Sequence, residues 1–135
     1  MGLFDKMVAA QGPQKKRAVS RSAERILALL RRDYHPIDMA PWEKPQCTIR
    51  LRAVQLTALA AVKETGGTFF PIGVGWGKTF ISLLAPVVRQ KKHAILIAPS
   101  ATLQNIREQI VELKKHYNIH TDYSIMSYGE ISKTT

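Results

Sequence analysis

The clearest pattern in the chain is a stretch in which apolar residues recur every three or four positions. It runs Leu103, Ile106, Ile110, Leu113 and Tyr117, with polar and charged residues between. This spacing predicts an amphipathic helix over 103–117. Two more helices are expected, one over 51–64 that stops at Gly66-Gly67 and one that starts at Lys78. Pro86 should kink or end the latter.

Short apolar runs between these helices predict strands at 68–72, 94–98 and 123–127. The run 94–98 is unbroken, as expected for a central parallel strand buried on both faces. Pro71 suits a central strand poorly, so the first strand should end at or before it. Lys91-Lys92-His93 marks a turn, and Ser100 could cap the helix that follows Pro99. Strands alternating with helices predict an α/β fold with a parallel sheet.

The N-terminal part is polar and basic. Residues 1–20 are expected to form a flexible basic arm, and 21–49 a helix from Ser20 or Ser22 to about Asp33 followed by a proline-containing linker. Nucleic-acid phosphates could be contacted by Lys15, Lys16, Arg17, Arg21 and Arg25. The alternative is a charged helix face that packs on a larger body.

Charge narrows the class of partner. The chain has 20 Lys and Arg against 10 Asp and Glu, a formal net charge of +10. Such an excess favours a polyanion, with nucleic acid ahead of an acidic membrane, although a solvated basic surface is the alternative. A single cysteine excludes a disulfide within the chain, and no apolar run approaches the roughly 18 residues that span a bilayer. We therefore expect no membrane partner and a cytoplasmic location, or a nuclear one in a eukaryotic or viral setting.

Three alternate glycines, Gly73, Gly75 and Gly77, lead into Lys78-Thr79 between a predicted strand and a predicted helix. Glycines let several backbone N–H groups converge on one anion, and a helix N-terminus adds its dipole. In such a phosphate-binding loop Lys78 would reach the β- and γ-phosphates, and the Thr79 hydroxyl would hold Mg²⁺. The strict loop pattern has glycine at position 72, where this chain has isoleucine. A purely structural glycine turn is the alternative.

Three segments, in this order and spacing, resemble the start of a superfamily 2 helicase or translocase. They are Leu51-Arg52-Ala53-Val54-Gln55, Gly75-Trp76-Gly77-Lys78-Thr79 and Ala98-Pro99-Ser100-Ala101-Thr102-Leu103. Members of this superfamily often lack the first glycine of the loop, which accounts for Ile72. The motifs are closer to those of DNA translocases of the chromatin-remodeller or restriction-enzyme kind than to those of DEAD-box RNA helicases.

The resemblance implies a fold, cofactors and site residues. The fold is a parallel α/β sheet of P-loop (RecA-like) type, an incomplete first lobe over 50–135 preceded by the basic helical segment. ATP and Mg²⁺ are the implied cofactors, with Gln55 reading adenine. The implied nucleotide-binding set is Arg52, Gln55, Gly73, Gly75, Trp76, Gly77, Lys78 and Thr79, with Thr79 on the metal. The segment from Pro99 to Thr102, together with Arg107, would bind the nucleic-acid backbone, and DNA is favoured over RNA.

The resemblance covers about residues 50–130, and the superfamily's Asp-Glu box and second lobe are not found in these 135 residues. Without these groups water is not activated, so we expect this chain alone to bind ATP with little or no hydrolysis. The remaining part of a split helicase is a candidate partner. Two alternatives stay open: a non-catalytic basic nucleic-acid-binding protein that retains half of an ATPase fold, and another P-loop enzyme such as a nucleotide kinase.

Overall fold

The computed structural model describes residues 2, 21–30, 33–68, 72, 73, 75 and 77–133. The chain divides into two compact units, 1–33 and 34–135. In the first unit α2 (Arg21–Leu30) confirms the predicted helix, and the side chains of Arg21 and Arg25 are exposed. The predicted arm, with Lys15, Lys16 and Arg17, lies outside the described residues.

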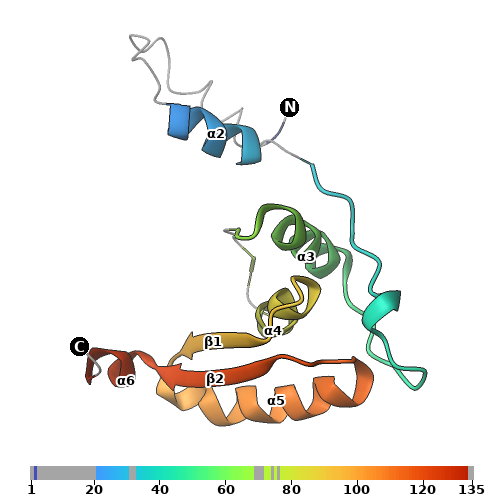
Figure 1. Cartoon of the computed structure of the whole chain (residues 1–135), viewed down its shortest axis with the longest axis vertical. Helices are drawn as coiled ribbons and strands as arrows, with labels where there is room; N and C mark the ends of the chain where they lie inside the picture. The colour runs from blue at the N-terminus through green and yellow to red at the C-terminus, as the bar shows by residue number, and fades with distance from the viewer. Residues whose placement is uncertain are drawn as a thin grey trace. The chain divides into compact units, whose positions relative to one another are not determined.

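The second unit contains the α/β part of the chain (Figure 1). Its elements in order are η1 (Ala40–Trp42), α3 (Ala53–Thr65), α4 (Lys78–Val88), β1 (His93–Ala98), η2 (Ser100–Thr102), α5 (Leu103–His116), β2 (Asp122–Ser127) and α6 (Tyr128–Lys133). The three predicted helices and the last two predicted strands are confirmed to within two residues. Within the described residues, no helix is long and apolar enough to cross a membrane.

β1 and β2 pair in parallel, from His93 opposite Asp122 to Ala98 opposite Ser127, and α5 connects them (Figure 1). This confirms an α/β fold with a parallel sheet, which has two strands within the described residues. The strand predicted over 68–72 is not confirmed. Thr68 and Ile72 have no strand conformation, and 69–71 lie outside the described residues.

The core lies on one face of this sheet. Leu96, Ala98, Tyr123 and Ile125 join a cluster with apolar side chains from α4 and α5. That cluster includes Leu83, Leu84, Val88, Ile110, Leu113 and Tyr117. The expectation that 94–98 is buried on both faces is wrong, because Ile95 is 68% exposed and Ile97 43%. Alternate strand residues point to opposite faces, and no described element covers the second face.

The segment predicted as a linker packs against α3 and the end of α5. The Ile37 N–H donates to the Leu56 carbonyl at 3.1 Å, and the Asn118 N–H donates to the Trp42 carbonyl at 2.7 Å. Glu43 and Tyr117 form an isolated antiparallel bridge. These backbone bonds fix η1 beside the start of the sheet.

Two local expectations need correction. Pro86 does not stop α4, which continues to Val88, because a proline in the last turn removes only the one hydrogen bond that its missing N–H would have made. Ser100 is not the N-cap of α5. It begins the 3₁₀ turn η2, which makes Thr102 the N-cap residue, and the Thr102 hydroxyl donates back to the Pro99 carbonyl at 2.8 Å.

Candidate nucleotide site and nucleic-acid interface

The glycine loop runs directly into the N-terminus of α4. Gly77 is its N-cap residue with φ 75°, and Gly75 has φ 81°. Both values lie in the left-handed region, where a side chain costs about 1–2 kcal/mol. Lys78 and Thr79 occupy the first turn, Lys78 exposed and Thr79 half-buried. Gly73 is exposed, whereas Trp76 lies outside the described residues.

The Leu-Arg-x-x-Gln segment holds this loop through two side chains. Arg52 Nη1 donates to the Gly75 carbonyl at 2.9 Å, and Gln55 Nε2 donates to the Gly77 carbonyl at 3.1 Å. Gln55 Oε1 also accepts the backbone N–H of Arg52 at 2.7 Å, which caps the start of α3. Residues more than 20 positions apart therefore form one polar cluster, which contains members of two of the three sequence motifs.

Gln55 is only 5% exposed, and both ends of its amide are satisfied by backbone groups. A Cβ atom placed on Gly77 would lie 2.1 Å from Gln55 Nε2. Position 77 thus requires glycine both for its backbone angle and for the close approach of the Gln55 amide. In this arrangement adenine recognition requires the amide to exchange the Gly77 carbonyl for a base edge.

A cavity of about 300 Å³ lies beside Lys78, between the end of α3 and α4. Ile72, Ile81, Ser82 and Val62 contribute to its lining. Its volume is at the lower end of the range for small-molecule sites. Lys78 therefore lines a largely apolar cavity next to the glycine loop.

The donor set suits a Mg–nucleotide. Mg²⁺ is commonly held by one or two protein oxygens, with phosphates and water completing its shell. The single hydroxyl of Thr79 in the first turn of α4, next to the Lys78 ammonium, fits that requirement. Among the described residues, no three His, Cys, Asp or Glu side chains gather as a separate metal site.

The predicted nucleic-acid segment follows the carboxyl end of β1. Pro99, Ser100, Ala101 and Thr102 are all exposed, three of them in η2. In open parallel sheets ligands bind outside the carboxyl ends of the strands, so this turn lies at the expected edge. The Thr102 hydroxyl is already bonded to Pro99, which makes Ser100 the better candidate for a phosphate contact.

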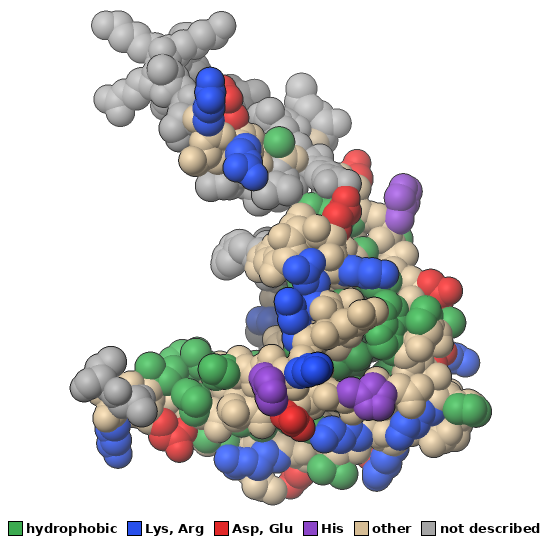
Figure 2. Space-filling model, in the orientation of Figure 1, with side chains coloured by type: hydrophobic (Ala, Val, Ile, Leu, Met, Phe, Trp, Pro, Cys, Tyr) green, Lys and Arg blue, Asp and Glu red, His purple; other side chains and the backbone are tan. Residues whose placement is uncertain are grey.

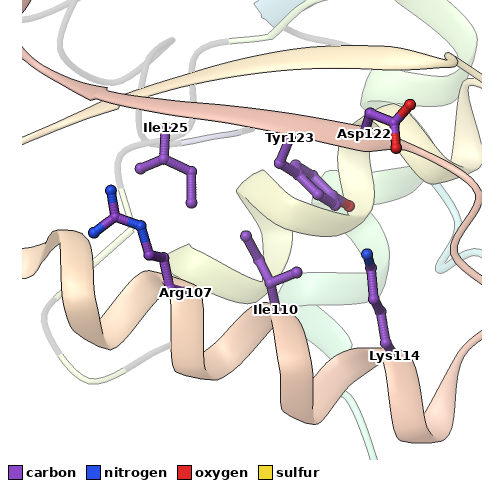
Figure 3. Close-up of a pocket in the computed structure, with 6 residues that line it drawn as sticks. All are labelled: Arg107, Ile110, Lys114, Asp122, Tyr123 and Ile125. Carbon is purple, nitrogen blue, oxygen red and sulfur yellow. The ribbon is translucent and has the colours of Figure 1, made fainter.

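Arg107 belongs to a different feature, a groove between α5 and β2 (Figure 3). Arg107, Ile110 and Lys114 rise from α5 toward Ile125, Tyr123 and Asp122 of β2, around a volume of about 500 Å³. The Tyr123 hydroxyl donates to the Leu83 carbonyl at 2.5 Å, and burial raises the pKa of Tyr123 to about 12. The sequence analysis assigned Arg107 to nucleic-acid binding but did not bring it together with the β2 residues.

Comparisons with protein-family models, with curated proteins and with solved structures found no match for this chain.

Proposed function

We propose that this chain is the ATP-binding portion of an ATP-dependent DNA helicase or translocase of superfamily 2. The observation that supports the proposal best is the contact of Arg52 and Gln55 with the carbonyls of Gly75 and Gly77. A chance glycine turn has no reason to be held by the segment that, in this superfamily, recognises adenine. The contact joins two of the three motifs that carry the resemblance.

Phosphate binding follows from the start of α4. The unpaired N–H groups of the first helical turn and the helix dipole favour an anion there. Lys78 adds a full positive charge at the same point, and Thr79 offers a hydroxyl to the metal ion. Mg²⁺ would neutralise phosphate charge, while this chain's own groups bind and orient the nucleotide.

Adenine recognition falls to Gln55. A carboxamide can donate to N7 and accept from N6 of adenine, which few other side chains can do together. Because the amide is held by the Gly77 carbonyl, a base that binds Gln55 also releases one restraint on the glycine loop. Base binding and loop conformation are therefore coupled through one side chain.

DNA contact is assigned to the turn after β1 and to basic side chains. Ser100 and the backbone N–H groups around it form a phosphate-binding turn that reads no base sequence. Lys and Arg side chains lie along α5 and beside the strands on the face drawn in Figure 2, where acidic ones are interspersed. The net charge of +10 supplies the long-range attraction.

The test is a calorimetric titration of the protein with ATP and Mg²⁺. Saturable binding is expected for the unchanged protein and for a control, Lys133→Ala, which removes a lysine from the end of α6. Lys78→Ala should remove binding. Unchanged affinity in Lys78→Ala would eliminate the phosphate-loop assignment. Little or no hydrolysis is expected from this chain alone, which contains no adjacent Asp-Glu pair.

A second candidate is a non-catalytic nucleic-acid-binding protein, which the charge of +10 and the exposed Arg21 and Arg25 of α2 favour. It predicts duplex DNA binding whose log K falls with log salt by about 0.9 per neutralised phosphate. DNA affinity that is the same with and without ATP, and the same in Lys78→Ala, would favour this candidate over the first.

A further inference from the structure

Another cavity lies at the end of the sheet where both strands begin, opposite the end that leads into the turn at Ser100. It has a volume of about 300 Å³, and its polar and aromatic lining residues include Trp42, Gln90, Lys91, Lys92, Asn118 and His120. The N–H of Asp122, the first residue of β2, donates to the carbonyl of Lys92, which directly precedes β1, at 2.8 Å. The six residues of β1, a length of roughly 20 Å, separate this end of the sheet from the turn at Ser100. The cavity is therefore distinct from the proposed nucleotide site and DNA contact.

The chemistry of the lining is one-sided in charge. Lys91, Lys92 and His120 are exposed basic residues, and no described residue that lines the cavity is acidic. Trp42 supplies an indole wall, and the Lys63 ammonium lies 5.3 Å from the centroid of its ring. That contact holds the ring and adds positive potential beside the cavity.

Two carboxamides, those of Gln90 and Asn118, also line the cavity, and Gln90 stands at a backbone position where glycine is more common. Gln90 has φ 53°, in the left-handed region. The Gln90 N–H donates to the Val87 carbonyl at 2.9 Å and the Lys91 N–H to the Pro86 carbonyl at 2.8 Å, which is the hydrogen-bond pattern of a Schellman helix end. Glycine occupies this position most often because it has no Cβ penalty. The chain instead places a strained glutamine whose side chain lines the cavity, and such strain commonly accompanies a binding role.

We propose that this cavity binds single-stranded nucleic acid. A base lies against the Trp42 indole, the Gln90 and Asn118 amides contact its polar edge, and Lys91 and Lys92 contact the adjoining phosphates. Stacking on aromatic rings combined with cations along the backbone is how proteins bind unpaired strands without sequence preference. An acidic peptide would use the lysines but leave the indole wall and the two amides without a role. The site does not depend on nucleotide binding at Lys78.

The experiment uses the fluorescence of Trp42 in the Trp76→Phe protein, which leaves one tryptophan. Titration with oligothymidylate, without ATP, should quench this fluorescence. Lys91→Ala/Lys92→Ala should weaken binding and flatten the slope of log K against log salt by about 1.4, since each single-strand phosphate contact contributes about 0.7. Arg50→Ala/Lys133→Ala removes the same charge at two exposed positions outside the cavity and outside the proposed DNA contact, and should leave the slope nearly unchanged.

The Trp42→Leu variant should bind oligothymidylate at least about five-fold more weakly. Its binding is measured by the fluorescence anisotropy of a labelled oligomer. If that variant fails to fold, the comparison of the two double variants still decides. Each of three results would overturn the proposal. They are equal effects of the two double variants, absence of quenching, and binding of thymidine monophosphate as tightly as the oligomer. Quenching that persists in Lys78→Ala supports a site separate from the nucleotide loop, whatever the outcome of the ATP titration. Quenching abolished by Lys78→Ala would overturn that separation.

Discussion

Alanine at Gly77 should destabilise the protein more than alanine at Gly75, although the two glycines have nearly the same backbone conformation. Their φ angles are 75° and 81°, so the left-handed penalty of about 1–2 kcal/mol is common to both. The surroundings differ. An added Cβ meets nothing within 4 Å at Gly75 but lies 2.1 Å from Gln55 Nε2 at Gly77.

The added methyl group at position 77 must displace the Gln55 amide. That movement breaks the bond from Nε2 to the Gly77 carbonyl and disturbs the bond that Oε1 accepts from the Arg52 N–H. Each is worth about 0.5–1.5 kcal/mol. Gly77→Ala should therefore cost about 2–5 kcal/mol in the free energy of unfolding and Gly75→Ala about 1–2 kcal/mol.

Urea unfolding of both variants, in the natural and in the Gln55→Ala background, measures this coupling as a double-mutant cycle. In the Gln55→Ala background the clash is gone, so the two glycine substitutions should cost the same. Equal costs in the natural background would refute the reasoning, because they would mean that Gln55 does not restrain the loop.

Three further outcomes are expected. Tyr123→Phe should lose about 1 kcal/mol at neutral pH with the bond to the Leu83 carbonyl. Because burial raises the Tyr123 pKa from 10.0 to about 12, its neutral form is favoured in the folded state. Its contribution is complete below pH 10 and is lost as pH rises toward 12, so urea unfolding of Tyr123→Phe should depend less on pH in that window. Gln90→Gly should increase the free energy of unfolding by about 0.5–1 kcal/mol, because relief of the left-handed strain exceeds the added freedom of the unfolded chain. The increase should appear as a higher thermal midpoint. Ile95→Thr on the open face of the sheet should change the free energy of unfolding by less than about 0.5 kcal/mol. Leu84 is 0% exposed, so Leu84→Ala should cost about 2–5 kcal/mol in urea unfolding. A large loss at Ile95 would mean that its face is covered in solution.

Periodicity predicted the helices because each has one apolar side that packs in the core, and short apolar runs predicted the two strands. The run from Leu103 to Tyr117 became α5 with Ile106, Ile110 and Leu113 buried. The same reasoning failed for Ile95 and Ile97, since an apolar run does not reveal whether anything covers its second face. α6 was missed, although Ser127 and Glu130 form a reciprocal capping box that the Ser-x-x-Glu spacing could have indicated.

The candidate site was predictable in its parts but not in its connections. The glycines, Lys78 and Thr79 follow from loop chemistry, and Gln55 was implied by the resemblance to superfamily 2. That Gln55 and Arg52 bond to the loop carbonyls depends on how α3 packs beside α4, which no local pattern encodes. The cavity at Trp42 joins a residue of η1 to the turn at Lys91, about 50 positions later. A contact of this kind depends on tertiary packing, and Lys91-Lys92 read alone indicated only a turn.

Nucleotide binding at the glycine loop can be observed at the atoms concerned. We would record the amide resonances of Gly75, Gly77 and Lys78 and the side-chain amide of Gln55 by NMR while ATP and Mg²⁺ are added. The predicted result is a saturable shift of all four signals in the unchanged protein and none in Lys78→Ala. Signals that stay in place at saturating ATP, or that shift equally in Lys78→Ala, would contradict nucleotide binding at this loop.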